Sequence, residues 1–184
     1  MHIIQLDTVV ESELALLAPC IGADLPGYRN HIYRVLTYAM HFMGGEARWR
    51  RPFAFALAYH DVGMWTHREL AYLEPSAARA EAARRDHAPD LDGALIHDLI
   101  VWHHKLTPFR GANAAAVNAL RKADWVDASQ GLLRKGLTRA QIAAVNAALP
   151  AHGFPDTLMR LAGDLNHGNR TGGLLRVLHK VYRV

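Results

Sequence analysis

Apolar residues recur at intervals of three and four along most of this chain, and that spacing is typical of one face of an α-helix. The stretch 28–45 is a clear case, because its apolar residues fall at Ile32, Val35, Leu36 and Ala39. Alanine and leucine are abundant, and few segments alternate polar and β-branched residues as a half-buried strand does. The sequence therefore predicts an all-α fold.

Glycine, proline and capping residues set the expected helix limits. We expect helices over 28–45, 52–61, 74–85, 91–106, 113–131 and 138–153, with one or two more beyond them. Asn113 is a suitable N-cap, and Thr138 with Gln141 fits a capping box. The loop-like stretch NHGNRTGG at 166–173 interrupts the C-terminal segment.

A length of 184 residues is sufficient for one well-buried core, and the chain has no internal repeat and no low-complexity linker. We therefore expect a single domain over residues 1–184. The formal net charge is +4 and the isoelectric point is near 9.5, which favours anionic small molecules as partners. The densest basic cluster, ARWRRP at 47–52, is short, so a nucleic-acid surface is not expected.

Cys20 is the only cysteine, so no internal disulfide can form and a reducing compartment is expected. We expect Cys20 to be a small core residue. The N-terminal stretch turns acidic at once and lacks the apolar segment of a secretory signal. No apolar run approaches the roughly 20 residues that span a bilayer, so the expected location is the cytoplasm, without a membrane partner.

Two strongly polar residues interrupt an apolar run in the stretch AYHDVG at 58–63. In the expected helix, His60 extends an apolar face and Asp61 follows in the last turn, before Gly63 permits a sharp exit. At a helix end, an imidazole and a short carboxylate can converge on one ion. The alternative is structural, with His60 a hydrogen-bonded core residue and Asp61 bound to nearby backbone.

A second anomaly lies in the stretch KADWVDA at 122–128. Helical spacing places Asp124 on the same apolar stripe as Val117 and Leu120. Burying an unpaired carboxylate costs several kcal/mol, and a divalent cation is one of the few partners that compensates for it. Pairing with an arginine or with a helix N-terminus is the alternative. Asp127, one turn later, is expected either to face solvent or to support a metal ligand indirectly.

A third candidate is His31, which lies at helical spacing from Val35, Tyr38 and Phe42 and so faces inward at least in part. Two imidazoles and two carboxylates from three helices form a mixed nitrogen and oxygen site. Such a site suits Mn, Fe, Co, Ni or Zn, and it suits Mg less well. Spacing alone does not choose among these metals.

The ordered set His31, His60 with Asp61, and Asp124 on separate helices resembles the H…HD…D pattern of the HD-domain superfamily of metal-dependent phosphohydrolases. The resemblance covers about residues 28–128. It implies an HD-domain helical bundle, with a motif-bearing core over about 27–130 and accessory helices over 138–184.

The same resemblance implies a function. One divalent transition metal per chain would be bound by the four residues His31, His60, Asp61 and Asp124. A metal-activated water would hydrolyse a phosphate ester, either a nucleotide or a small phosphorylated metabolite. The catalytic residues would be His60, Asp61 and Asp124.

Three departures from the family pattern bear on this chemistry. Diiron members carry two further histidines; Leu73 in YLEPSAA stands where the first is expected, whereas LIVWHHKL supplies His103 with His104 beside it. Met64 stands where some single-metal members carry a glutamate that acts as general acid. A full second metal site, and with it an oxygenase activity, is therefore disfavoured. Either Asp127 or a histidine would have to supply the proton, or the leaving group would need no such help.

His103 and His104 have two interpretations. They either belong to the site, as second-metal ligands, supporting groups or phosphate contacts, or they lie at an exposed helix end where cationic histidine suits the helix dipole. Helical spacing places His103 beside the apolar stripe of this helix and His104 further round. His103 is therefore the better placed of the two.

The expected phosphate-binding cations are Arg34, one turn from His31, and Lys105, after the double histidine. His97 lies two turns from His104, about 10 Å away, and cannot share an ion with it. Six further histidines form no constellation and are expected at the surface: His41, His67, His87, His152, His167 and His179.

A non-catalytic module that binds a nucleotide or a similar anion through the same metal site is the main alternative, and Leu73 and Met64 favour it. An iron-dependent oxygenase is a weaker alternative, because it requires two metals. A nucleic-acid binder would need a contiguous basic face, which we do not find in the sequence. The expected partner is therefore a phosphorylated small molecule, and the sequence leaves self-association open.

Overall fold

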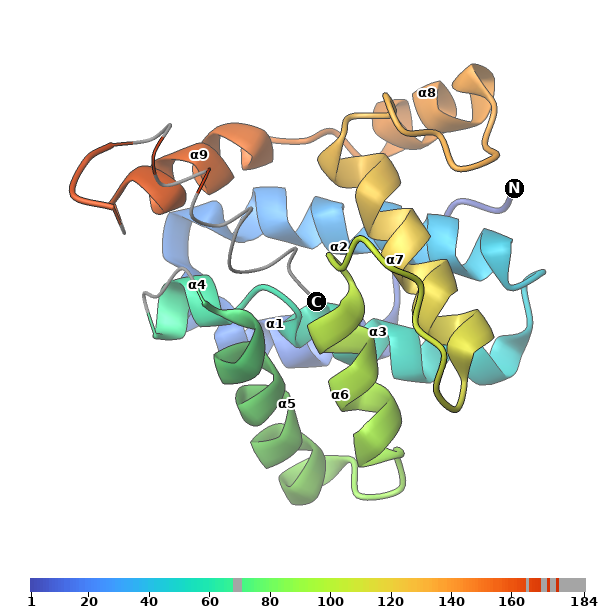
Figure 1. Ribbon diagram of the computed structural model, residues 1–184, viewed down its shortest axis with the longest axis horizontal. Helices are drawn as coiled ribbons and strands as arrows, with labels where there is room; N and C mark the ends of the chain where they lie inside the picture. Colours follow the sequence, from blue (N-terminus) through green and yellow to red (C-terminus); the bar gives the residue numbers. More distant parts are fainter. Residues whose placement is uncertain (68–70, 165, 170–171, 173–174, 176–184) are drawn as a thin grey trace.

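The computed structural model describes residues 1–67, 71–164, 166–169, 172 and 175, and that part of the chain is helical and has no strand (Figure 1). The predicted all-α fold is therefore confirmed. Short 3-10 turns, η1 (Gly22–Asp24) and η2 (Ala47–Trp49), precede α2 and α3. The α-helices are α1 (Thr8–Ile21), α2 (Leu25–Phe42), α3 (Arg50–Tyr59), α4 (Gly63–Thr66), α5 (Leu73–His87), α6 (Gly93–Trp102), α7 (Ala114–Ala128), α8 (Arg139–Ala148) and α9 (Phe154–Asp164).

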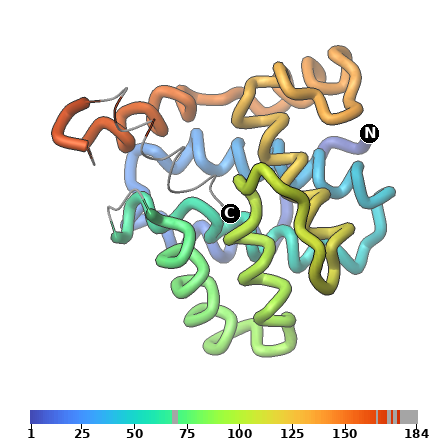
Figure 2. Tube along the Cα trace, viewed as in Figure 1, coloured from blue at the N-terminus to red at the C-terminus, as the bar shows by residue number. Residues whose placement is uncertain are grey.

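Helix α2 lies near the centre of the molecule, where it contacts α1, α3, α7, α8 and α9. In the view of Figure 1, α7 crosses α2, with which it makes extensive contact. Helices α5 and α6 form an adjacent pair that packs against α3, and α1 also packs on α3. The tube in Figure 2 shows α8 and α9 on the side of α2 that lies away from this pair.

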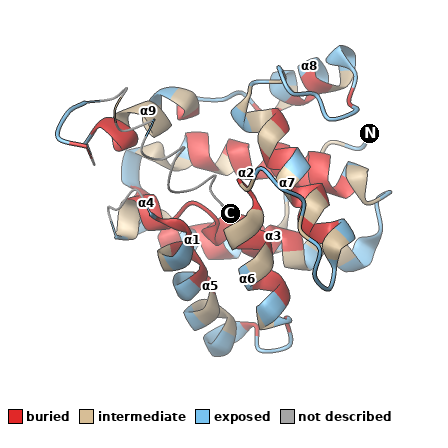
Figure 3. Ribbon diagram, viewed as in Figure 1, coloured by how far each residue is buried: buried red, intermediate tan, exposed pale blue. Residues whose placement is uncertain are grey.

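Helices α2 and α3 are buried almost without interruption, as the colours of Figure 3 show. Large aromatic side chains fill this layer: Tyr28, Tyr33, Tyr38, Phe53, Phe55 and Tyr59. Helices α8 and α9 join the same core through Ile142, Val145 and Phe154, so the C-terminal helices pack on the part of the chain that carries the motifs. Among the helices that the structure describes, none is both long and apolar enough to cross a membrane.

Local signals account for several helix ends. Thr138 and Gln141 form the predicted capping box of α8, with Thr138 Oγ1 3.2 Å from the Gln141 amide nitrogen. Asn113 precedes α7 as predicted, but its backbone is left-handed, with φ of 59°, and its side chain does not cap the helix. Helix α2 ends at Phe42, earlier than predicted, and glycines with positive φ at 44–45 turn the chain.

Cys20 is exposed, so the prediction that it lies in the core is wrong. The buried stripe of α1 passes through Val10, Leu14, Leu17 and Ile21, and Cys20 lies beside this stripe. Its thiol donates to the Leu17 carbonyl oxygen at 3.0 Å. We predicted burial from the residue type alone, but the position of Cys20 around the helix axis places it beside the buried stripe and leaves it exposed.

Helix α3 ends one residue before His60, so His60 and Asp61 lie in the turn that follows the helix. Gly63 then begins the short helix α4, and its φ is not positive. Gly63 provides space instead, because a Cβ there would lie 2.4 Å from the Tyr72 carbonyl oxygen and 2.9 Å from Ser76 Oγ. Ser76 Oγ accepts from the Gly63 amide at 2.9 Å. Glycine at this position lets the start of α5 pack directly against the turn that carries the HD pair.

Gly63→Ala is expected to destabilise the protein by about 1–3 kcal/mol, because the added Cβ forces the backbone at Tyr72 to move. The midpoint of urea unfolding should fall while the m-value stays constant. Ser76→Ala is the matched control, because it removes the hydrogen bond to the Gly63 amide without adding volume, at a cost of about 1 kcal/mol. An unchanged midpoint for Gly63→Ala would contradict the close approach of the two segments.

Asp24, in η1, ties α9 to the start of α2. Its carboxylate accepts from Trp65 Nε1 at 2.9 Å, from Arg160 Nη2 at 2.6 Å and from Thr157 Oγ1 at 3.3 Å. Burial raises the pKa of Asp24, but these donors outweigh burial and the net shift of the pKa is downward. The contact therefore depends on an ionised carboxylate.

Asp24→Asn is expected to lower the free energy of unfolding by about 1–2 kcal/mol at pH 7. Because the pKa of folded Asp24 is lowered, its contribution is present above the ordinary value of 3.8 and is lost as the pH falls through the folded value. Urea unfolding should therefore separate the variant from the wild type at pH 7 and show little difference near pH 2. Asp156→Asn, at an exposed carboxylate of α9, should show no such separation. An equal cost of Asp24→Asn at both pH values would contradict the assignment.

Candidate metal centre

Segments far apart in the sequence bring histidine and aspartate side chains together in the interior. They are His31 from α2, His60 and Asp61 from the turn after α3, His103 and His104 from the turn after α6, and Asp124 from α7. All of these side chains are buried. The four residues of the predicted metal site therefore lie together, and both members of the double histidine join them. We call these residues the buried cluster.

Two of the histidines are placed by helix C-termini, where carbonyl groups lack intrahelical donors. His60 follows the last residue of α3, and its Nδ1 donates to the Leu57 carbonyl oxygen at 2.7 Å. His103 follows the last residue of α6, and its Nδ1 donates to the Ile100 carbonyl oxygen at 2.5 Å. Each ring is held by the carbonyl group three residues earlier, so its Nε2 atom is turned toward the carboxylates of the cluster.

His31 is held by a carboxylate instead, because its Nδ1 lies 2.7 Å from Asp127 Oδ2 and donates to it. A ring that donates from Nδ1 has its Nε2 atom available to bind a proton or a metal ion. The Nε2 atoms of His31 and His60 lie 3.0 Å apart. Two nitrogen lone pairs at this distance repel each other, so either a proton between them or a metal ion bound by both would stabilise the contact.

Asp61 lies between the histidines. Its Oδ2 is 3.2 Å from His60 Nε2 and 3.9 Å from His31 Nε2, and its Oδ1 is 3.4 Å from His103 Nε2. Neither Asp61 Oδ1 nor His103 Nε2 makes a hydrogen bond within the described part of the chain. Buried polar atoms without a hydrogen bond are rare in native proteins, and a metal ion held by these residues could satisfy both atoms.

Asp124 closes the cluster from α7, on the buried stripe that its spacing predicts. Its Oδ1 lies 3.5 Å from His31 Nε2, and its Oδ2 lies 3.1 Å from His104 Nδ1. Burial raises the pKa of Asp124, but the surrounding histidines, His104 foremost, outweigh burial and lower that pKa to about 2. The carboxylate is therefore ionised at neutral pH.

The protonation states of the other members follow from the same competition between burial and charge. Burial would raise the pKa of Asp61, but His60 and the neighbouring histidines hold that pKa well below its usual value. Burial lowers the pKa of His60 to about 4, so its ring is neutral at pH 7. Burial also opposes protonation of His103, yet Asp61 and Asp124 outweigh it and raise the pKa of His103. The cause of this rise is the negative charge of Asp61 and Asp124 beside the His103 ring.

The cluster and its support carry an excess of negative charge. Burial raises the pKa of Asp127, but His31 and Arg34 outweigh it and lower that pKa, so this carboxylate is ionised as well. Arg34 compensates Asp127, so the negative charges of Asp61 and Asp124 are left to the surrounding histidines and to any bound cation. Uncompensated buried charge is strongly unfavourable, and a divalent cation would neutralise both charges.

Ligands of one transition-metal ion lie roughly 2.9–3.5 Å from one another when each is bound at about 2.0–2.2 Å. Most of the separations given above fall in this range, whereas the 3.9 Å between Asp61 Oδ2 and His31 Nε2 is wider. Three overlapping groups have their donor atoms within 4.8 Å: His31, His60 and Asp61; His60, His103 and Asp124; and Asp61, His103 and His104. Imidazole nitrogen and carboxylate oxygen together suit Mn, Fe, Co, Ni or Zn. The residues therefore fit the predicted class of metal.

Arg34 supports Asp127. Its Nε and Nη2 donate to Asp127 at 2.5 and 2.8 Å, and its Nη1 donates to the Leu149 carbonyl oxygen at 3.0 Å. The Asp127 side chain is only 7% exposed, so it does not face solvent but holds His31. These contacts do not favour Arg34 as a phosphate ligand. Lys105 is half-buried next to His104, and its phosphate-binding role stays a prediction.

Leu73 and Met64 stand where the HD-domain resemblance led us to look for a histidine and a glutamate. Both are buried and pack together with Tyr72 and Leu161 in a small apolar cluster. These two positions therefore contribute apolar surface and no ionisable group.

His104 is buried, which differs from its predicted position further round the helix. Helix α6 ends at Trp102, so the angular spacing of helical residues no longer applies to the two histidines. The Tyr72 hydroxyl lies 2.9 Å from His104 Nε2. Tyr72 precedes α5, where helical periodicity does not indicate which way a side chain points, and the sequence analysis missed it.

Phe154 is the second residue that the sequence analysis missed. Its ring stacks on His31, with centroids 4.6 Å apart and planes inclined by 23°. It comes from α9, in the C-terminal third that the family resemblance does not cover. Gly27 permits this approach, because a Cβ there would lie 3.2 Å from Phe154 Cβ. Only the tertiary structure brings these residues together.

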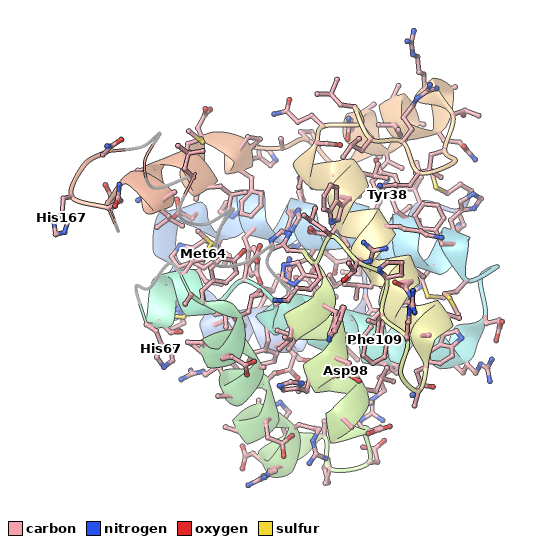
Figure 4. The ribbon with its side chains drawn as sticks, viewed as in Figure 1. Tyr38, Met64, His67, Asp98, Phe109 and His167 are labelled. Atoms are coloured by element: carbon pink, nitrogen blue, oxygen red, sulfur yellow. The ribbon has the colours of Figure 1, made fainter. Side chains whose placement is uncertain are left out.

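The remaining histidines lie outside the cluster. His97 is exposed and lies 3.4 Å from Glu74, away from His104. The surface predictions are confirmed for His41, His67, His87, His152 and His167, whereas His179 lies outside the described residues. Figure 4 labels two of them, His67 and His167, at the edge of the molecule. His87 also contacts the buried Glu13, with Nε2 2.9 Å from Oε2.

No family model matches the chain, and no curated protein or solved structure matches it either. Inference about function therefore depends on the buried cluster itself, on its charge balance and on the order of its residues along the chain.

Proposed function

We propose that this protein is a metal-dependent phosphohydrolase of the HD-domain type, which hydrolyses a phosphate ester such as a nucleotide or a small phosphorylated metabolite. The observation that carries the proposal is the 3.0 Å separation of the Nε2 atoms of His31 and His60, whose Nδ1 atoms both face oxygen acceptors. Asp61 and Asp124 lie beside them in the order that the H…HD…D resemblance implies.

The metal would be held by His31, His60, Asp61 and Asp124, with His103 as a further nitrogen donor. A bound divalent transition metal lowers the pKa of its water toward about 7 and stabilises negative charge on a phosphoryl group. The chain fixes the ligands beforehand. Asp127 holds one imidazole, and helix-end carbonyl groups hold two others, so that Nε2 of each ring is oriented toward the site.

The leaving alcohol needs a proton, and His104 with Tyr72 is the pair placed to deliver it. The Tyr72 hydroxyl lies 2.9 Å from His104 Nε2. Burial lowers the pKa of His104, so its neutral ring accepts a hydrogen bond from the hydroxyl, which keeps its proton and can donate it to the leaving oxygen. Met64 and Leu73 add only apolar surface at this edge. We assign proton delivery to Tyr72 and His104 for this reason.

A non-catalytic module that binds a nucleotide or another anion is the second candidate. The engagement of Arg34 by Asp127 and the apolar contact between Met64 and Leu73 favour it, because both remove groups that a catalytic site would use. A diiron oxygenase is a weaker candidate, favoured only by the burial of His103 and His104 beside Asp61.

Turnover of simple esters tests the proposal. The purified protein, loaded in turn with Mn, Fe, Co, Ni and Zn, is assayed with p-nitrophenyl phosphate and bis(p-nitrophenyl) phosphate. We expect hydrolysis by the wild type and by the control variant Asp98→Ala, and none by His60→Ala. Asp98 lies on α6 (Figure 4), and its carboxylate pairs with the exposed His97. Metal binding by the wild type without hydrolysis of either ester would contradict the proposal and favour the binding module.

A further inference from the structure

A cavity of about 240 Å³ lies between the central helix and the C-terminal helices. It is lined by residues of α2, α7, α8 and α9 and by the segments that precede α9 and follow α7. The metal site as described above uses no residue of α8 or α9. Helices α8 and α9 therefore line a cavity in addition to packing on the core.

The cavity adjoins the buried cluster through one shared residue. His31 lines the cavity, and the Nε2 atom of the same ring is 3.0 Å from His60 Nε2. Asp127 and Arg34, which hold His31, also line it. A molecule in the cavity would therefore contact one of the proposed metal ligands directly, and His31 is the residue that the two sites share.

The lining carries no net charge. Arg34 and Asp127 are its charged members apart from His31, and they neutralise each other through two hydrogen bonds. A phosphate group would find no uncompensated positive charge there, and burying it would be costly. The cavity therefore favours an uncharged occupant.

The remaining lining residues offer both apolar and hydrogen-bonding surface. Phe154, Pro155 and Leu158 provide apolar contacts, and the amides of Gln130 and Asn146 provide donors and acceptors. Sites for drug-sized ligands measure about 300–1,000 Å³, so this cavity suits a smaller molecule or one part of a substrate.

We propose that this cavity binds the uncharged alcohol portion of the phosphate-ester substrate, while the phosphoryl group lies at the metal centre. The inference rests on the proposed function and deepens it, because it assigns substrate selection to α8, α9 and the end of α7. An ester of a small apolar alcohol would contact the apolar residues of the lining but would make no hydrogen bond to the amides of Gln130 and Asn146. The preferred alcohol therefore carries both an apolar face and several polar groups.

Ala128→Phe tests the assignment, because Ala128 is the exposed last residue of α7 and lines the cavity without belonging to the metal site. Ala147→Phe is the matched control, on an exposed position of α8 outside the lining. The measured quantity is the ratio of kcat/KM for thymidine 5′-monophosphate to kcat/KM for methyl phosphate. We expect this ratio to fall by about tenfold in Ala128→Phe, through a higher KM for the larger ester, and to stay constant in Ala147→Phe.

Direct binding separates this inference from the proposed function. The uncharged probes thymidine, adenosine, myo-inositol and glycerol are titrated into the metal-loaded wild type and both variants, and binding is followed by NMR. At least one probe should bind the wild type and Ala147→Phe and should bind Ala128→Phe about tenfold more weakly. Such a result without ester turnover would contradict the phosphohydrolase alone. Equal binding by Ala128→Phe, or no binding of any probe to the wild type, would overturn the assignment of the cavity.

Discussion

Asp61→Ala is expected to abolish both metal binding and phosphate-ester hydrolysis. Asp61 belongs to two of the three groups of donor atoms, and its two oxygens face different histidines, His60 on one side and His103 on the other. Without it, the metal would lose a charged ligand at the centre of the site. We expect bound metal below about a tenth of an equivalent and turnover reduced by at least about a thousandfold.

Asp61→Asn and Asp98→Ala are the controls for this substitution. Asparagine keeps the size of the side chain at 61 and removes its charge, so Asp61→Asn should lose metal while retaining the helical circular dichroism of the wild type. Asp98→Ala removes a carboxylate that pairs with His97 outside the cluster, and it should bind metal normally. Turnover by Asp61→Ala after the metal is lost would exclude the proposed role of the metal.

Removal of the metal is expected to lower the melting temperature by about 10 °C. A ligand that binds only the folded state at about a thousand times its Kd stabilises that state by about 4 kcal/mol, and each kcal/mol shifts Tm by about 2–4 °C at this chain length. The physical cause is the excess negative charge that Asp61 and Asp124 leave in the interior without a cation. Calorimetry before and after dialysis against a chelator measures the shift.

Asp124→Ala provides the control for chelation. It removes one of the two excess carboxylate charges together with a ligand, so its melting temperature should not respond to the chelator. Adding the metal back should restore the wild type and leave the variant unchanged. A wild-type Tm that is the same with and without chelator would show that the cluster is stable as a set of hydrogen-bonded side chains alone.

The sequence predicted the position of the four candidate ligands because each of them breaks a regular apolar pattern. Asp124 lies on the buried stripe of α7, as the spacing indicates, and His31 lies inward on α2. His60 and Asp61 were found by their place at the end of an apolar helix. Helical periodicity reports burial directly, and a buried ionisable residue requires a partner, so this part of the site follows from local pattern and elementary energetics.

The supporting residues could not be predicted in the same way, since they act through tertiary contacts. Tyr72 reaches His104 from the start of α5, and Phe154 reaches His31 from α9. Neither position differs in local pattern from an ordinary core aromatic residue. The burial of His104 stayed open in the sequence analysis for another reason: the helix ends at Trp102, and helical spacing does not extend beyond the helix.

The sequence analysis identified Gly63 as a special position, but the structure gives a different physical reason for a glycine there. The sequence indicated a residue needed for a sharp exit from the helix, whereas the backbone at Gly63 is helical and has no positive φ. The requirement is the 2.4 Å approach that a Cβ would make to the Tyr72 carbonyl oxygen. Such close packing between segments leaves no trace in hydrophobic periodicity.

Metal content is the most direct test of the central claim. Wild-type protein is purified without chelator and without a metal-affinity step, beside Asp124→Ala and Asp98→Ala, and each is measured by elemental analysis. The account predicts about one divalent transition-metal ion per chain in the wild type and in Asp98→Ala, and none in Asp124→Ala. No bound metal in the wild type, even after reconstitution with Mn, Fe, Co, Ni and Zn, would contradict it.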